Sequence, residues 1–334
     1  MKKLQYITLS NHVNQNGKAE TINLSYQTFG KALHTAPIVM VNHALTGNSN
    51  VIGKDGWWND LIGDNKCIDT NKYTVLAFNI PGNGFDALEK NLISNYKEYT
   101  ASKIAEIFAE GLKKLKIKTL FAVIGGSVGG ALAWELAILK PNLISHLIPI
   151  ATDWKATDWL IANCHIQDAI LNNSNKPLED ARMHAMTLYR TPESLFNKFE
   201  RSKKTDSLFN VESWLNYHGK ALNERFNLSA YKMMNQVLRS INVANTKEEF
   251  IKKASRIKSN IHIITINSDL FFKAEENWGT YVDLKAVKPN VTIGEIKSIH
   301  GHDAFLIEFD QLSNLLKPIF KNQILKKEIL KQAI

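Results

Sequence analysis

Cysteine is scarce in this sequence, and its scarcity excludes two common ways of stabilising a chain. Cys67 and Cys164 are the two cysteines among 334 residues, too few for a disulfide framework and too far apart for a Cys-x-x-Cys metal motif. We therefore expect a reducing, cytoplasmic location. Hydrophobic residues make up 44% and charged residues 22%, which excludes bulk disorder and a fibrous chain. The length predicts one large domain or two ordinary ones.

Long uncharged hydrophobic segments are also lacking. Residues 1–6 lead into an alternating pattern and not into an apolar run, so we expect no signal peptide. The run of near membrane-spanning length, residues 121–139, contains Glu135 and a block of four glycines. The glycines divide this run into a short strand and a short helix, so the sequence predicts no membrane segment.

The formal charge of +9 is spread thinly along the chain. The densest basic stretches, residues 113–116 and 326–331, have the pattern of solvated helix faces. No interleaving of arginine with aromatic residues marks a nucleic-acid surface, so we expect no nucleic-acid partner. A basic exterior does favour anionic substrates, such as phosphate-bearing cofactors.

Apolar runs of strand length alternate with helical patterns in the first 150 residues. Continuous apolar runs are typical of strands covered on both faces, and the alternation predicts an α/β fold: a mostly parallel sheet flanked by helices. The expected strands are 22–30, 37–42, 74–79, 121–124 and 147–150, with one helix at about 100–115 and another ending at Leu139.

The pattern changes between residues 152 and 254, where helical periods dominate and buried strand runs are missing. Strand patterns return at 261–266 and 291–296, followed by a closing helix that we expect from about Asp303 to Lys317. We predict one α/β core, residues 1–151 and 255–334, interrupted by a helical lid insertion, residues 152–254.

The sharpest chemical signal is Gly-Gly-Ser-Val-Gly at 125–129, directly after a buried strand and before a helix. It matches G-x-S-x-G, in which glycines permit a turn too tight for a Cβ and the serine hydroxyl projects over the sheet edge. The helix N-terminus directs backbone N–H groups at charge that develops beside this hydroxyl. Ser127 is the predicted nucleophile, and the alternative is a glycine-rich turn whose serine caps the helix.

A serine hydroxyl needs a base, and in chains with this turn the acid and the histidine follow the serine in that order. Asp269 comes just after a late buried strand, and His300 and His302 follow the last one. We choose His302 as the base because it adjoins the closing helix, whereas His300 lies where the strand ends. His300, His302 and Asp303 could instead bind a metal, but no further ligand spacing supports a metal site.

Charge on the reacting oxygen needs two backbone donors. The N–H of Val128 supplies one, and the second should come from the loop His43-Ala44-Leu45-Thr46-Gly47, which follows the strand 37–42. Leu45 is the predicted donor by position, and His43 is interpreted as structural.

Two glycine patterns resemble nucleotide-binding motifs but fail in context. Residues 82–87 match G-x-G-x-x-A after a strand, yet no helix opens there. Residues 47–55 have the wrong glycine spacing for a phosphate loop, and Asp55 stands where Ser or Thr must hold magnesium. The sequence predicts neither kind of nucleotide site.

Taken together, these motifs resemble the homoserine O-acetyltransferases, the α/β-hydrolase-fold branch of the homoserine acyltransferases of methionine biosynthesis. Any single motif is unspecific, but the ordered set covers nearly the whole chain. The matching segments are 43–47, 56–60, 68–70, 125–130, 181–182, 188–190, 209–215, 225–227 and 301–306.

The resemblance implies an α/β-hydrolase fold and a ping-pong acyl transfer, with acetyl-CoA as co-substrate and no bound cofactor. Ser127 would take the acetyl group, and L-homoserine would collect it on its side-chain oxygen. Residue by residue, Ser127, Asp269 and His302 match the family's catalytic triad. The family also forms homodimers, so we expect a homodimer.

The resemblance further implies a site for the amino-acid acceptor. Arg182 and Tyr189 match acceptor-site residues of the family, and Asp303 matches the acidic residue that meets the acceptor's ammonium group. This agrees with chemistry, because a zwitterion needs a guanidinium for its carboxylate and a carboxylate for its amine. The ordinary alternatives are a surface ion pair for Arg182 and a helix cap for Asp303.

One region departs from the family pattern. Where the family carries a glycine-rich, cysteine-containing stretch, this chain reads Ile-Pro-Gly-Asn-Gly-Phe-Asp at 80–86, and Thr46 and Asn48 replace the commoner Ser and Asp. Because these positions lie near the expected acyl pocket, succinyl-CoA as donor and L-serine as acceptor stay open. A serine hydrolase or esterase of the same fold is a further alternative, since the same triad hydrolyses esters when water reaches the acyl-enzyme. A non-enzymatic scaffold would leave the ordered triad to chance.

Overall fold

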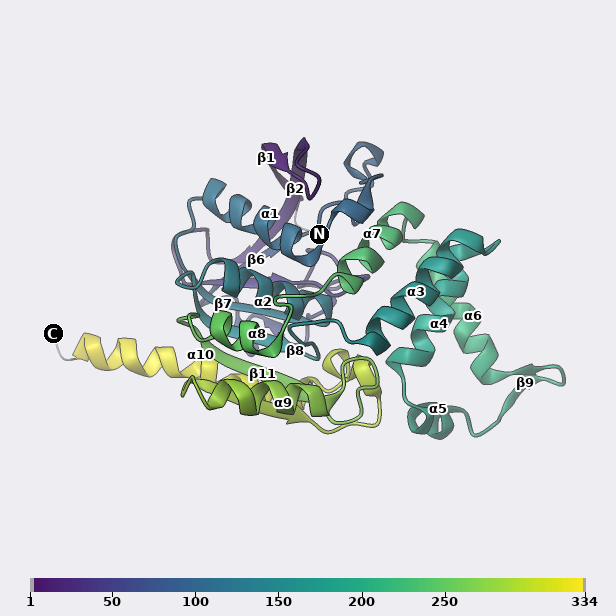
Figure 1. The fold of residues 1–334 in the computed structure, drawn as a ribbon. Helices are drawn as coiled ribbons and strands as arrows, with labels where there is room; N and C mark the ends of the chain where they lie inside the picture. Colours follow the sequence, from purple (N-terminus) through teal and green to yellow (C-terminus); the bar gives the residue numbers. More distant parts are fainter. Residues whose placement is uncertain (1–2, 333–334) are drawn as a thin grey trace.

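A computed structural model of the chain describes the backbone of residues 3–332 and the side chains through Lys321. Eight of the described strands form one sheet in the order β1-β2-β6-β3-β7-β8-β11-β12 (Figure 1). The strands from β6 to β12 pair in parallel, whereas β2 pairs antiparallel with β1 and β6. Their bounds are β1 Gln5–Val13, β2 Ala19–Gly30, β3 Ile38–Asn42, β6 Thr74–Phe78, β7 Leu120–Gly126, β8 Ile144–Ile150, β11 Asn260–Ile266 and β12 Val291–Ile296.

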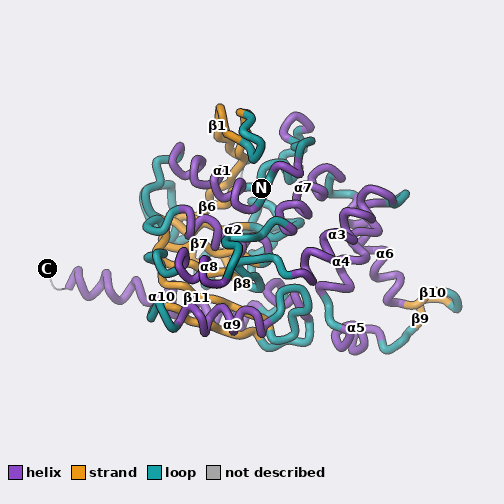
Figure 2. Tube along the Cα trace, viewed as in Figure 1, coloured by secondary structure: helices purple, strands orange, loops and turns teal. Residues whose placement is uncertain are grey.

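Helices cover both faces of this sheet. Successive residues of a strand point to opposite faces, so Met40 of β3 joins one hydrophobic cluster and Val41 joins the other. The first cluster lies under α1 (Ala101–Lys114), α2 (Val128–Leu139), α8 (Lys247–Ala254) and α9 (Ala274–Lys285), which Figure 2 shows in front of the strands. The second lies under α10 (Phe309–Gln332) and the segment that carries Trp58. A mostly parallel sheet flanked by helices is thereby confirmed.

The segment between β8 and β11 is helical, and most of it lies to one side of the sheet (Figure 1). Helices α3, α4, α6 and α7 pack on one another, and a short β9–β10 hairpin extends beyond α5. Their bounds are α3 Asp158–Asn173, α4 Pro177–Tyr189, α5 Pro192–Phe199, β9 Lys203–Thr205, β10 Leu208–Phe209, α6 Asn210–Asn223 and α7 Leu228–Arg239. Helices therefore dominate the chain between β8 and β11.

Helix α8 lies apart from that group of helices. Its Phe250 stacks on Trp154 with ring centroids 4.4 Å apart and meets Trp134 of α2 edge-on at 5.6 Å. The aromatic contacts hold α8 against the sheet layer. The division into a core and a lid at residues 152 and 254 stays a prediction.

The predicted start of the closing helix, at about Asp303, is wrong. Residues Gly301–Leu306 form a separate 3-10 helix, η3, and α10 begins only at Phe309. The backbone leaves the helical region at Ile307, with φ −125° and ψ −47°, which separates the two helices. Helix α9 was not predicted, because Trp278 and Val282 face solvent and obscure its apolar stripe.

Two sequence predictions concern membrane segments and basic stretches. No helix within residues 3–332 combines the length and apolarity needed to cross a membrane. The basic stretch 326–331 falls on the part of α10 whose side chains lie outside the described residues.

Candidate active site

Ser127 sits on a strained turn between β7 and α2. Its φ of 57° and ψ of −132° are unfavourable for a side chain with a Cβ, and its N–H donates to Ile150 O at 2.9 Å. Neighbouring glycines permit this geometry, because a Cβ on Gly125 would lie 2.5 Å from the backbone of Gly129, and one on Gly129 would lie 2.4 Å from Asn42 O. The surrounding backbone therefore fixes the serine at the carboxyl edge of the sheet.

Asp269 and His302 form a buried hydrogen-bonded pair at the same edge. His302 Nδ1 lies 2.7 Å from Asp269 Oδ2, and the two residues are 3% exposed. The other carboxylate oxygen accepts the N–H groups of Phe271 at 2.7 Å and Phe272 at 2.9 Å. This arrangement orients the carboxylate towards the imidazole and leaves Nε2 of His302 available for a proton.

The serine turn and the histidine belong to adjoining parts of the core. A Cβ on Gly126, next to Ser127, would lie 2.4 Å from the ring of Phe305 on η3, and that ring lies 5.6 Å from the ring of His302. Ser127 Oγ makes no hydrogen bond to a described side chain, which is common in sites without substrate. The structure thus brings the three predicted triad residues to one edge.

Two backbone N–H groups beside the serine are free to donate. Leu45 N–H has no hydrogen-bond partner among the described residues, and Val128 opens α2, where N–H groups lack intrahelical acceptors. His43 holds the loop of Leu45, because its Nε2 accepts from Ile80 N at 3.0 Å and its Nδ1 donates to Ala44 O at 2.8 Å. Burial lowers the pKa of His43 to about 4, so the ring is neutral, as a structural role requires.

The three expected acceptor-site residues lie around His302. The Arg182 guanidinium lies 5.8 Å from the ring of Tyr189, and this ring lies 5.5 Å from that of His302. Asp303 follows His302 directly in η3. Burial raises the pKa of the Asp303 carboxyl, and the charge of Arg182 opposes this shift. The arrangement provides one cationic and one anionic group beside the histidine.

Two further arginines approach this site, and the sequence reasoning gave them no role. Arg190 acts electrostatically on Asp303, and Arg225 donates from Nη1 to Thr46 O at 3.1 Å. Burial and the nearby Arg182 lower the pKa of Arg225. Both arginines lie in segments that carry the family resemblance, 188–190 and 225–227. This resemblance was the one sequence signal that could have indicated a role for them.

A small cavity of about 10 Å³ adjoins the site. Its walls include Leu45, Leu188, Tyr189, Tyr231 and Phe271. A volume of this size is about that of one water-sized probe. Bulky groups therefore cannot enter this cavity without movement of its walls.

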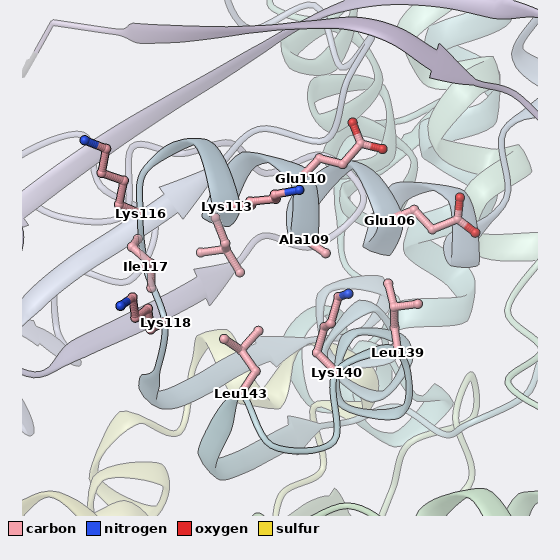
Figure 3. A pocket seen from close by; sticks show the side chains of 11 residues that line it. Glu106, Ala109, Glu110, Lys113, Lys116, Ile117, Lys118, Leu139, Lys140 and Leu143 are labelled. Atoms are coloured by element: carbon pink, nitrogen blue, oxygen red, sulfur yellow. The ribbon is translucent and has the colours of Figure 1, made fainter.

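A much larger cavity, of about 660 Å³, lies elsewhere (Figure 3). It is lined by the last turns of α1 and α2, including Lys113 and Lys140, whereas Ser127 precedes the other end of α2. The 12 residues of α2 span about 18 Å, so this cavity is separate from the triad. Lysines at helix C-termini complement the helix dipole, which explains their presence there.

No set of three or more His, Cys, Asp or Glu side chains in the described part of the chain is arranged to hold a metal ion. His300 instead faces Arg190, with Nη2 of the arginine 2.9 Å from Nδ1 of the histidine. His300 Nδ1 is thus occupied by contacts with Arg190 and Ser194.

A strained serine turn, a carboxylate-bound histidine and two free N–H groups at the edge of a parallel sheet define a serine enzyme of the α/β-hydrolase class. The family model described as alpha/beta hydrolase fold matches residues 37–282. The chain is 32% identical to a homoserine O-acetyltransferase of Methanococcus vannielii, over 91% of this chain and 70% of that one. It is 31% identical to one of Cyclobacterium marinum, over 89% of each chain. The chain thus belongs to the homoserine O-acetyltransferase family, a family of acyltransferase enzymes.

Solved structures support the same fold. A homoserine O-acetyltransferase from Bacillus anthracis superposes with a TM-score of 0.85 at 18% identity, over 96% of this chain and 97% of that one. An acetylester hydrolase from Corynebacterium glutamicum gives 0.79 at 17% identity, over 95% and 96%. Because transferases and hydrolases share this fold, the likeness shows the architecture and leaves the choice of acceptor to the site.

Proposed function

We propose that this protein is a homoserine O-acetyltransferase, which moves an acetyl group from acetyl-CoA to the hydroxyl of L-homoserine through an acyl-serine intermediate. The observation that carries the proposal is the pairing of the Asp269–His302 unit with Arg182 and Asp303 in one site. A simple esterase has no need for a cation and an anion placed to hold a zwitterion.

In the first half-reaction, Ser127 Oγ attacks the thioester carbonyl while His302 Nε2 takes its proton. The negative charge on the carbonyl oxygen is met by the N–H groups of Leu45 and Val128. The C–S bond then breaks, and the thiolate leaves with the proton from His302 as free CoA. Asp269 stabilises the imidazolium during this step.

In the second half-reaction, the hydroxyl of L-homoserine gives its proton to His302 and attacks the acetyl-serine carbonyl. The bond to Ser127 breaks, and the serine oxygen recovers the proton. Arg182 and Tyr189 bind the acceptor carboxylate, and Asp303 binds its ammonium group. Because these two charges hold both ends of the amino acid, the length of its side chain decides how far its hydroxyl reaches. The hydroxyl of L-serine, one methylene shorter, stops short of the acyl carbon.

Succinyl-CoA is a second candidate donor, and one observation favours it. Burial, and in addition the charge of Arg182, lowers the pKa of Arg225, so two guanidinium groups lie near one another, and Arg182 also acts electrostatically on Asp303. A carboxylate on the acyl chain would neutralise the surplus positive charge. Parallel assays with the two thioesters decide between them.

We further propose that residues 152–254 form a lid over the acyl-enzyme and that the protein acts as a cytoplasmic homodimer. Phe196 on α5 and Tyr217 on α6 are 68% and 67% exposed, and a symmetric interface on this side would bury them. Sedimentation at micromolar concentration should show twice the chain mass of 37.7 kDa. A species of 37.7 kDa alone would contradict the dimer.

The proposed activity is tested by free thiol release from acetyl-CoA with and without L-homoserine. Sustained release that depends on L-homoserine supports the transferase. Sustained release without acceptor would instead identify a hydrolase, with water as the acceptor.

A further inference from the structure

We propose that Arg190, Ser194 and His300 form a polar latch that positions the acceptor-binding side chains, so that His300 and Ser194 are positioning residues for the second half-reaction. This inference rests on the proposed function. Ser194 Oγ accepts from Arg190 Nε at 3.1 Å and from Nη2 at 2.5 Å, and it lies 3.0 Å from His300 Nδ1. Arg190 Nη2 donates to the same Nδ1 at 2.9 Å.

The chemistry of the polar latch fixes the state of its histidine. Arginine is a donor only, so Nδ1 of His300 must carry a lone pair and the ring proton must sit on Nε2. Ser194 is 1% exposed, whereas Arg190 and His300 are half-buried. Removing His300 therefore takes away the acceptor of the buried Ser194 hydroxyl.

The polar latch connects two segments that carry opposite halves of the acceptor site. Arg190 directly follows α4, the helix of Arg182 and Tyr189, while His300 stands three residues before Asp303. The latch thus sets the separation between the guanidinium and the carboxylate that must bracket the acceptor.

Backbone contacts at the same junction support this reading. Thr191 Oγ1 donates to Ile299 O, and Ser194 N donates to Thr191 Oγ1 at 3.0 Å. A Cβ on Gly301, where φ is 68°, would lie 2.7 Å from Tyr189 O. The two segments are therefore in direct contact, with no room to slide past one another.

His302 depends less on this junction than Asp303 does. The ring of His302 has its own anchor in Asp269, at 2.7 Å, and packs among Phe271, Phe272 and Phe305. Loosening the polar latch should consequently weaken acceptor binding and transfer while Ser127 acylation continues. A purely structural role would lower both half-reactions together.

The test uses His300→Ala, His300→Asn and Ser194→Ala in the full-length enzyme. Acylation is measured as the pre-steady-state burst of CoA from acetyl-CoA alone, and transfer as kcat/KM for L-homoserine. His300→Ala should lower this kcat/KM about tenfold, the loss expected for one charge-assisted hydrogen bond, and change the burst rate less than about twofold. His300→Asn should recover most of the loss, because its Oδ1 can occupy the position of Nδ1. Ser194→Ala should behave like His300→Ala: it should lower kcat/KM for L-homoserine and largely spare the burst rate.

The outcomes separate the polar latch from the proposed function. Absence of CoA release by the unaltered enzyme overturns the proposed function and the acceptor role of the latch with it. If the unaltered enzyme transfers normally, two results overturn the latch alone. One is that His300→Ala and Ser194→Ala both leave transfer unchanged. The other is that they lower both half-reactions equally, with no rescue by His300→Asn. Melting temperatures of the three variants show whether any of them is simply unfolded.

Discussion

The proposed nucleophile and the proposed acceptor site adjoin one another but are held in different ways. Ser127 is fixed by backbone geometry, because its turn is closed on the backbone of Asn42 and Gly129. Arg182 and Asp303 belong to a helix of the insertion and to η3, and the contacts of Arg190 and Ser194 with His300 join these two segments. On the proposed function, this difference leads us to expect that acylation depends on the core, whereas transfer to an amino acid depends on how the insertion packs on it. Substitutions should therefore separate the two half-reactions.

The largest effect should come from Ser127→Ala. Without the hydroxyl no acyl-enzyme can form, so the single acetyl adduct that acetyl-CoA leaves on the unaltered protein should disappear. Intact-mass analysis measures the adduct, and Ser194→Ala, which removes a different buried hydroxyl, is the matched control. An adduct of equal yield in Ser127→Ala would contradict the assignment.

Next in size is the loss of the base. His302→Ala should lower turnover by about a thousandfold or more, because the serine loses its proton acceptor in both half-reactions. His300→Ala, two residues away, should cost about tenfold and only in transfer. Steady-state turnover of the two variants measures the contrast, and a larger loss in His300→Ala would reverse the choice of histidine.

Arg182→Ala should weaken transfer to L-homoserine and leave the acylation of Ser127 intact. Loss of the guanidinium removes a charge-assisted pair worth about 2–3 kcal/mol, or roughly 30- to 150-fold in kcat/KM for L-homoserine. The burst of CoA should persist, because Arg182 does not touch the serine turn. Arg256→Ala, an exposed arginine outside the site, serves as control. Loss of the burst in Arg182→Ala would show that acylation also needs the acceptor site, and it would contradict the separation of the two half-reactions.

The smallest expected effect is a difference in pH dependence. Burial raises the pKa of Asp303, so its carboxyl takes up a proton at a higher pH than an ordinary Asp, although Arg182 limits the shift. The carboxylate pairs with the ammonium group above that pKa, and the pairing is lost as pH falls through it. The ratio of kcat/KM for L-homoserine to the burst rate should therefore fall several-fold on acidification. In Asp303→Asn the ratio should be low at every pH, and a pH-dependent ratio that survives in this variant would contradict the role.

The strained turn of Ser127 could be predicted from sequence because its geometry depends on adjacent residues. Ser127 needs glycines on both sides and a strand and helix around it, and each of these leaves a pattern in adjacent residues. Asp269 and His302 follow from topology, since parallel strands deliver their next loops to the same edge.

The contacts of Arg190 and Arg225 could not be predicted in the same way. A long arginine side chain finds its partners through tertiary packing, and His300 and Thr46 are 110 and 179 residues away in sequence. The start of the closing helix was misplaced for a related reason. The apolar pattern runs through residues 303–317, but packing of η3 against the core breaks the helix at Ile307.

The most direct test of the account is a single-enzyme experiment with acetyl-CoA in which free thiol and the mass of the protein are followed together. Without acceptor, we predict one burst of CoA per active site and a stable acetyl adduct on Ser127. Addition of L-homoserine should then discharge the adduct and start sustained CoA release, while L-serine should do so about a hundredfold more slowly. Sustained release without acceptor, or discharge by L-serine as fast as by L-homoserine, would contradict the account.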